Sequence, residues 1–162
     1  DCPCLFGTVL RIDGLFRMWY IGTRNSNKPR ICYAESTNGI SWERPELGIC
    51  EYRGSKQNNI ILCDNKGLFD SICHDPDDGK APFKRIYLGP GGIRGSISKD
   101  GYHWTELDKP ILAKPPASDV QSLWFNKVDG RYIITFKSEI DASRRTVRIA
   151  ESEDFRTFSI RG

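Results

Sequence analysis

The sequence predicts an all-β protein that folds as about three four-stranded antiparallel blades of a β-propeller. Three observations predict this fold: a short motif that recurs three times, an Asp-Gly turn that keeps step with it, and runs of β-forming residues between the two markers. The motif repeats after 62 residues and again after 54 residues. Propeller blades usually span about 40 to 50 residues, so a period of this size with several short strands indicates slightly enlarged blades.

The recurring motif consists of a serine, then Asn or Asp two residues on, then an aromatic residue four residues later. Its copies are STNGISW, SKDGYHW and SEDFRTF, which begin at Ser36, Ser98 and Ser152. Serine hydroxyls and Asn or Asp side chains bond the backbone N–H groups of turns, so the motif predicts a turn between the third and fourth strands of each blade. We interpret the motif as a folding element and not as a catalytic site. We also expect the four tryptophans to be core residues, and these are Trp19, Trp42, Trp104 and Trp124.

Each motif follows a predicted β-hairpin by 20 to 23 residues, counted from the aspartate of an Asp-Gly pair. These pairs begin at Asp13, Asp78 and Asp129, and their glycines supply the positive φ that a tight hairpin requires. A third β-forming run precedes the motif serine, and the run with the aromatic residue supplies a fourth strand. The segment RPELGICEYRGSKQNNIIL lengthens the first blade and predicts a loop with an added strand over residues 59–62.

We therefore expect a single partial propeller domain over residues 1–162, with blade-like repeats at about 1–57, 58–112 and 113–162. Three blades do not close a ring, so two sheet edges and the central channel would stay open. The sequence begins at Asp1 and not at methionine, from which we expect a section of a longer protein. The remaining blades of that protein, or self-association of copies, would cover the open edges.

The composition narrows the classes of partner. The 24 basic and 21 acidic residues are scattered and give a net charge of +3, so we expect neither nucleic acid nor a membrane surface as a partner. No apolar run approaches the roughly 18 residues of a membrane span. His74 and His103 occupy different phases of the repeat, and no Cys or His spacing suits zinc, so we expect no metal and no organic cofactor.

Six cysteines are too few for a disulfide scaffold, and we expect most of them to be reduced core residues. One or two disulfides in a secreted chain remain an open alternative. The cellular compartment is therefore open too, with a secreted or periplasmic location favoured over a cytoplasmic one.

Three aspartates precede the predicted innermost strands of the blades: Asp1, Asp70 and Asp119. The starting ends of these strands surround one rim of a propeller channel, so the three carboxylates would converge. Glycoside hydrolysis needs one protonated carboxyl and one ionised carboxylate, and mutual repulsion helps to separate their pKa values. The alternative is that each aspartate only satisfies the backbone of a turn. We expect a glycoside hydrolase acting on an oligo- or polysaccharide, with a non-catalytic carbohydrate-binding propeller as the alternative.

The sequence also resembles a known family through the phrases FRMWY, CYAESTNGISWERPELG, GSKQNNIIL, SKDGYHW and SDVQSLWFNKVDGRY. These phrases are similar to bacterial proteins called glycoside hydrolase family 32 N-terminal-like. Those proteins belong to the five-bladed propeller superfamily of invertases, arabinanases and family 43 enzymes. The resemblance covers essentially the whole chain, and family members are much longer.

The resemblance implies roles for two of the aspartates. It implies that Asp119 stabilises the transition state, although the Arg and Pro that flank this aspartate in the invertase-like families are absent here. It implies that Asp70 is the base or nucleophile, although the Asn-Asp-Pro-Asn signature is absent. The acid glutamate would belong one blade later, about where the chain ends. In a register shifted by one blade, Asp1, Asp70 and Asp119 would be the three rim positions.

Overall fold

The computed structural model describes residues 4–22, 30–63, 68–113, 117–141 and 144–161. These residues form thirteen β-strands in three antiparallel sheets and no helix, which confirms the all-β prediction. No helix long and apolar enough to cross a membrane occurs among them. The chain divides into two compact units, Asp1–Lys66 with the first sheet and Gly67–Gly162 with the second and third sheets.

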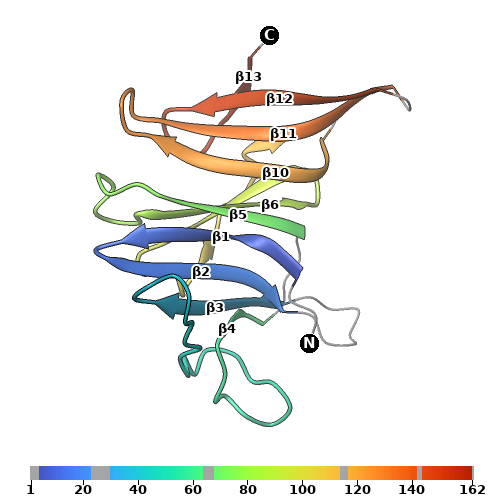
Figure 1. Ribbon diagram of the computed structural model, residues 1–162. Coiled ribbons are helices and arrows are strands. Elements are labelled where there is room, and N and C mark those ends of the chain that lie inside the picture. The colour runs from blue at the N-terminus through green and yellow to red at the C-terminus, as the bar shows by residue number, and fades with distance from the viewer. Residues whose placement is uncertain (1–3, 23–29, 64–67, 114–116, 142–143, 162) are drawn as a thin grey trace. The chain divides into compact units, whose positions relative to one another are not determined.

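The first sheet contains four strands in chain order, drawn in blue to teal in Figure 1. They are β1 (Cys4–Ile12), β2 (Leu15–Gly22), β3 (Arg30–Ser36) and β4 (Ile60–Leu62). The hairpin between β1 and β2 turns at Asp13 and Gly14, with φ values of 50° and 84°. Positive φ at both central residues is the type I′ geometry that suits the right-handed twist of a hairpin, so the predicted Asp-Gly turn is present.

The fourth strand of the first sheet comes from a different segment than the repeat predicts. The run after the motif serine makes only an isolated bridge, between Glu35 and Glu43. The added strand expected over residues 59–62 forms as β4 and pairs with β3, so the first sheet extends to Leu62. The segment between the bridge and β4 folds back on the sheet, where Ile49, Cys50 and Tyr52 pack with Cys32 and Ile60.

A disulfide joins Cys50 to Cys63 and closes this inserted segment. Cys32 and Cys73 are free and buried, as expected for reduced core cysteines. The structure therefore contains a disulfide in addition to reduced core cysteines. The disulfide stabilises the insertion mainly by restricting the unfolded chain.

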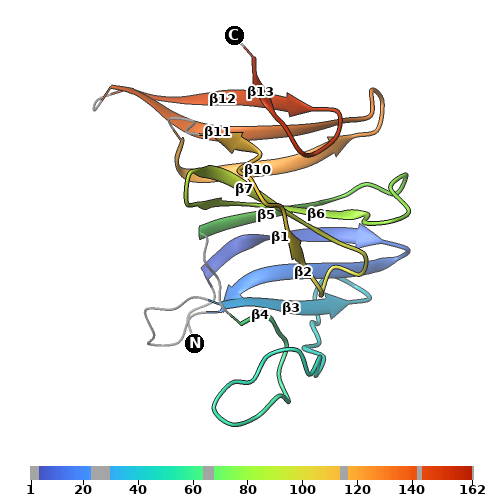
Figure 2. The ribbon, with the colours of Figure 1, turned by 180° about the vertical axis from the view of Figure 1, so that it is seen from behind.

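The second unit contains two sheets, seen from the back in Figure 2. The second sheet consists of β5 (Leu68–His74), β6 (Phe83–Gly89), β7 (Gly92–Ser98) and β8 (Thr105–Glu106), with β9 (Leu112–Ala113) also paired to β7. The third sheet consists of β10 (Ala117–Asn126), β11 (Arg131–Asp141), β12 (Arg144–Ser152) and β13 (Ser159–Ile160).

One apolar core lies between the second and third sheets. Ile86 and Ile134 are completely buried in it, and Phe136 and Phe155 are nearly so. A Cβ atom added at Gly95 would lie 3.0 to 3.3 Å from side-chain atoms of its neighbours, so a larger residue would force these side chains to shift. Face-to-face packing of twisted antiparallel sheets is the arrangement of adjacent propeller blades.

The recurring serine motif forms the same hydrogen-bonded turn in all three copies. The serine Oγ accepts a bond from the backbone N–H of the Asn or Asp at 3.3 Å. The Oδ1 of that residue accepts bonds from the N–H groups two and three residues further on, at 2.7 to 3.1 Å. The interpretation of the motif as a folding element is confirmed.

The fourth position of the motif has positive φ in every copy: 74° at Gly39, 84° at Gly101 and 60° at Phe155. A non-glycine residue in this region is strained, yet Phe155 is only 1% exposed and lies in the core between the sheets. Burial of its ring offsets the backbone strain. The third copy therefore uses the turn to place a core aromatic residue.

The four tryptophans do not all lie in the core, since Trp42 and Trp104 are only half-buried. Trp19 is 1% exposed and confirms the expectation of a core residue. Trp124 is 39% exposed, so the expectation was wrong for this residue. It pairs in register with Ile133 on the face of the third sheet that points away from Leu123 and Ile134, which are both in the core. The alternation of side chains along a strand shows which residues share a face of the sheet. Which of the two faces is buried depends on how the sheets pack against one another.

Candidate functional site

All three innermost strands are irregular near their starting ends. In β5, Phe69 and Asp70 stand opposite the single residue Tyr87 of β6. In β10, residues 118–120 stand opposite the single residue Lys137 of β11. In β1, two residues follow Cys4 without any counterpart in β2. Extra residues of this kind are β-bulges, which bend a strand, re-aim side chains and are common next to active sites.

Asp70 and Asp119 both belong to these bulges. The positions of the two aspartates can be compared by counting from equivalent residues of the three strands. These residues are Thr8, Ser71 and Ser122, which all lie where the strands pair regularly. Asp70 precedes Ser71 by one residue, and Asp119 precedes Ser122 by three residues. The two aspartates thus occupy neighbouring and not identical positions of the repeat. The description of both residues is confined to their backbone, and Asp1 lies outside the described residues.

The two bulged strands that carry Asp70 and Asp119 are neighbours in space. The backbone N–H of Leu123 in β10 donates a 2.9 Å hydrogen bond to the Ser71 Oγ in β5. Ser71 follows Asp70 directly, and both strands start on the same side of the second unit, at the right in Figure 1. The structure therefore brings the starts of β5 and β10 together, as expected for innermost strands of adjacent blades.

A buried cation lies on β6 next to the bulge of β5. Arg85 is 1% exposed, pairs in register with Ile72, and lies with its guanidinium carbon 4.3 Å from the centre of the Tyr87 ring. Its Nη1 donates to the Ser96 Oγ at 3.3 Å and lies 3.4 Å from the Glu106 carboxylate. A buried guanidinium favours ionised over protonated carboxyl groups in its surroundings. The run FKRIYLG gave no sign in the sequence that this arginine would be buried.

Tyr87 faces the bulge of β5 from the opposite strand, and its hydroxyl donates to Glu106 at 2.5 Å. Burial raises the pKa of Tyr87, and the hydrogen bond to Glu106 raises it further. The phenol therefore stays protonated at neutral pH and acts as a hydrogen-bond donor. Arg85, Tyr87 and Glu106 form one connected polar cluster behind the start of β5.

A second polar cluster lies at the opposite end of β5. Asp75 follows the strand and is 5% exposed, and its carboxylate accepts hydrogen bonds from the Asp77 backbone and from the Tyr132 hydroxyl. Lys84, which is 2% exposed, donates to Asp78 at 2.5 Å and to the carbonyl of Ala81. Asp75 and Tyr132 thus make a contact between two sheets, which no local sequence pattern could reveal.

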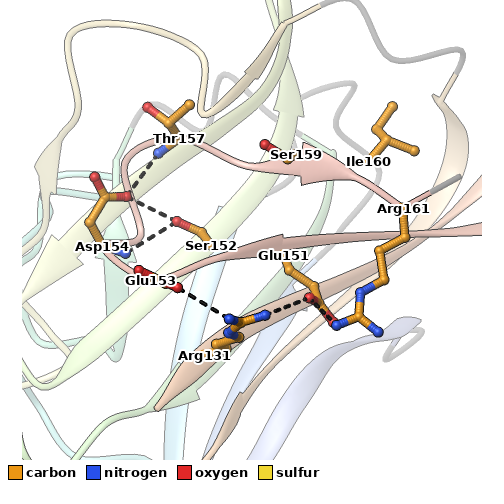
Figure 3. A pocket seen from close by; sticks show the side chains of 9 residues that line it. All are labelled: Arg131, Glu151, Ser152, Glu153, Asp154, Thr157, Ser159, Ile160 and Arg161. Atoms are coloured by element: carbon orange, nitrogen blue, oxygen red, sulfur yellow. Dashed lines mark hydrogen bonds and ion pairs between the residues drawn. The ribbon is translucent and has the colours of Figure 1, made fainter. Parts of the chain in front are cut away.

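A polar groove of about 400 Å³ lies along the outer strands of the third sheet, as Figure 3 shows. Its walls are formed by Arg131, Glu151, Ser152, Glu153, Asp154, Thr157, Ser159, Ile160 and Arg161. Glu151 lies 3.4 Å from Arg131 and 2.6 Å from Arg161, and Arg131 also lies 3.2 Å from Glu153. Because the opposite charges are paired with one another, we interpret the groove as an ion-pair network that joins β13 to the sheet. It contains neither Asp70 nor Asp119.

Within the described part of the chain, no group of three or more His, Cys, Asp or Glu side chains has the geometry to hold a metal ion. The side chains of Asp70 and Asp119 are outside that search.

Comparison with known proteins gives matches to solved structures only. No protein-family model matches the sequence, and no curated protein sequence matches it. The family 43 endo-arabinanase of Bacillus licheniformis matches with a TM-score of 0.59 and 14% identity over 95% of this chain and 58% of that chain. Fructan 1-exohydrolase IIa of Cichorium intybus matches with a TM-score of 0.64 and 13% identity over 93% of this chain and 30% of that chain. In fold, this chain is similar to the β-propeller glycoside hydrolases of families 32 and 43.

The propeller fold also occurs with other chemistry. An N-acetylgalactosamine deacetylase from F. plautii, solved with blood group B trisaccharide, matches with a TM-score of 0.65 and 9% identity over 95% of this chain and 50% of that chain. The chain spans about half the length of this solved protein, and a smaller share of some others. Because one fold supports several reactions, the fold of a propeller does not by itself decide the reaction.

Proposed function

We propose that the chain contributes to a propeller glycoside hydrolase, with three blade-like repeats over residues 1–162 and with Asp70 and Asp119 as catalytic carboxylates. The observation that carries the proposal is the pair of β-bulges at the starts of the adjacent strands β5 and β10, since each bulge contains one of these aspartates. A bulge leaves residues unpaired and disrupts the hydrogen bonds of the sheet. Bulges at the starts of both strands, each with a carboxylate, therefore suggest a role other than packing.

In this proposal Asp119 stabilises the positive charge that develops on the sugar, and Asp70 acts as base or nucleophile. The buried guanidinium of Arg85 next to the β5 bulge favours an ionised carboxylate there, which suits the proposed role of Asp70. Asp1 is the third candidate carboxylate. The substrate is an oligo- or polysaccharide, in keeping with the carbohydrates named for the structural neighbours, arabinan and fructan.

The test is release of reducing sugar from a panel of arabinans, fructans and galactans by the protein and by Asp70→Asn and Asp119→Asn. Asp129→Asn is a matched control, because Asp129 lies in the hairpin turn at the far end of β10. We expect Asp70→Asn and Asp119→Asn each to reduce hydrolysis at least about a hundredfold, as loss of a catalytic carboxylate does. Melting temperatures should stay within about 2 °C of the parent protein.

Two results would overturn the catalytic assignment. The first is hydrolysis that survives both substitutions. The second is a panel in which nothing is cleaved but some glycans bind, which would make the protein a non-catalytic carbohydrate-binding propeller.

A further inference from the structure

Three arginines lie near two tyrosines in the first unit, whereas Asp70 and Asp119, the proposed catalytic aspartates, belong to the second unit. Arg30 begins β3, Arg44 follows the isolated bridge at Glu43, and Arg53 lies in the inserted segment closed by the Cys50–Cys63 disulfide. The guanidinium carbons of Arg30 and Arg53 lie 4.6 and 5.3 Å from the centre of one ring, that of Tyr52. Two cations thus contact a single aromatic ring.

Arg44 acts on the pKa values of Cys32 and Tyr20, two residues of the same cluster. Burial raises the pKa of the Cys32 thiol, and the charges of Arg30 and Arg44 both oppose that rise. Burial also raises the pKa of Tyr20, while Asn59 and Arg44 act in the opposite direction. Cys32, Tyr20 and Tyr52 pack in one cluster, and the contacts of Arg30 and Arg53 with the Tyr52 ring place these two arginines beside it.

Within the described residues, no ion pair joins any of the three arginines to a carboxylate. This distinguishes them from Arg85, Arg131 and Arg161, each of which has a glutamate within 3.4 Å. Guanidinium groups that have no carboxylate partner among the described residues attract anions by their charge. Guanidinium groups bind planar carboxylates and tetrahedral oxyanions through paired N–H donors.

The turn that carries Arg53 is rigid before any ligand arrives. Arg53 and Gly54 have φ values of 54° and 78°, so they form a two-residue turn closed by backbone bonds between Tyr52 and Ser55 at 2.8 and 3.2 Å. The Asn58 side chain donates to carbonyls on both sides of this turn, at 2.8 and 3.1 Å. A preformed turn lowers the entropy that binding must overcome. Arg53 adopts a backbone conformation that favours glycine, which indicates that the side chain serves a purpose there.

We propose that Arg30, Arg44 and Arg53, around Tyr20 and Tyr52, form a binding site for the oxyanion of an acidic polysaccharide, a uronate carboxylate or a sulfate ester. The arginines bind the anionic group, and the exposed edges of the tyrosines contact the sugar ring beside it. The inference rests on the proposed function only in taking a carbohydrate as the ligand. It does not require hydrolysis, because none of the three arginines is one of the proposed catalytic residues.

The test is calorimetric titration at low ionic strength with trigalacturonate, its neutral methyl ester, a sulfated trisaccharide, inorganic sulfate and a short single-stranded DNA. We expect the protein to bind trigalacturonate or the sulfated trisaccharide and not the methyl ester. Binding should weaken as salt is added. The double variant Arg30→Gln/Arg53→Gln should lose at least about tenfold in affinity, because two charge-assisted contacts are removed.

Arg156→Gln is the matched control, since it removes one exposed positive charge from the third motif turn. It should bind as the parent does, and so should Asp70→Asn, which separates this site from the proposed catalytic one. A uronate that binds while the sulfated sugar does not, or the reverse, identifies the source of the oxyanion. The proposal is overturned by tighter binding of DNA than of either glycan, by equal binding of inorganic sulfate and the acidic sugars, or by an affinity that the double variant leaves unchanged.

Discussion

The hydroxyl of Tyr132 donates a hydrogen bond to the carboxylate of Asp75 and joins the second sheet to the third sheet. Tyr132 is 5% exposed and so is Asp75, although 57 residues of chain separate them. Burial raises the pKa of Tyr132, and the hydrogen bond to Asp75 raises it further. The pair therefore forms a buried hydrogen bond between two sheets that otherwise pack through apolar side chains.

Tyr132→Phe should lower the free energy of unfolding by about 1 to 3 kcal/mol, because the buried Asp75 carboxylate loses a donor. Urea denaturation followed by fluorescence measures the change. In a background of Asp75→Asn, which leaves no buried charge, the same substitution should cost less. Equal losses in the two backgrounds would show that the Tyr132 hydroxyl contributes to stability independently of the Asp75 carboxylate.

Raising the pH should destabilise the parent protein through the same residue. The folded state holds the Tyr132 proton more tightly than the unfolded state does, so this stability is complete below the ordinary tyrosine pKa of about 10 and declines as pH rises beyond it. Tyr132→Phe removes the titrating group. Its melting temperature should therefore fall less than that of the parent between pH 9 and pH 11, and parallel curves would contradict the prediction.

Acid should act through Asp100 of the second motif turn. Burial alone would raise the pKa of Asp100, but hydrogen bonds from His103, Tyr102 and Ser98 outweigh it and lower the pKa to about 2. The stability this carboxylate supplies is present above its ordinary pKa of about 4 and is lost as pH falls toward 2. Asp100→Asn copies the Asn38 of the first motif and should flatten melting temperature between pH 4 and pH 2. If the melting temperature of Asp100→Asn falls between pH 4 and pH 2 as steeply as that of the parent, Asp100 makes no such contribution.

Phe155 offers a test of strain against burial. Phe155→Ala should cost about 3 to 5 kcal/mol for the lost ring. Phe155→Gly should be more stable than Phe155→Ala by about 1 kcal/mol, because glycine adopts the positive φ without strain. Phe136, equally buried but within β11, is the control, and there Ala should be the more stable replacement. The same order at both positions would show that the backbone at Phe155 is not strained.

The Cys50–Cys63 disulfide closes a loop with a sequence separation of 13. A bridge over a loop of this size contributes about 3 kcal/mol in the chain-entropy description. Cys50→Ser/Cys63→Ser should lower the melting temperature, and a reducing agent should lower that of the parent to a similar value while leaving the double variant unchanged. A parent that ignores the reducing agent would show that the bridge is unimportant for stability.

The sequence predicted much of the fold because its strongest signals are local. The serine motifs depend on φ and on hydrogen bonds within a few residues, and they form as predicted. The glycine of the Asp-Gly pair has the predicted positive φ at Gly14 and Gly130. The prediction was wrong for Gly79, which lies in the longer connection between β5 and β6 and has no positive φ. The fourth strand of the first sheet was harder, because pairing with β3 is decided by which distant segment offers the better partner. The contact between Tyr132 and Asp75, the burial of Arg85 and the exposure of Trp124 depend on how sheets pack, which no periodicity encodes.

The candidate site shows the same division. An aspartate next to a β-forming run can be read from the sequence, and this is how Asp70 and Asp119 were selected. The bulges around them cannot, because a bulge exists only relative to a partner strand. The arginines around Tyr52 were missed too, since Arg30 and Arg53 meet only after the insertion folds back on β3.

The bulges have a consequence for how such a protein changes over time. A residue gained or lost in a regular strand turns every later side chain over to the other face, and that would expose the core. At the starts of β1, β5 and β10 the surplus residues are absorbed before Gly7, Ser71 and Gln121, where regular pairing is restored. Insertions and deletions in these few positions can therefore vary the chemistry of the rim while the packing of the sheets is inherited unaltered.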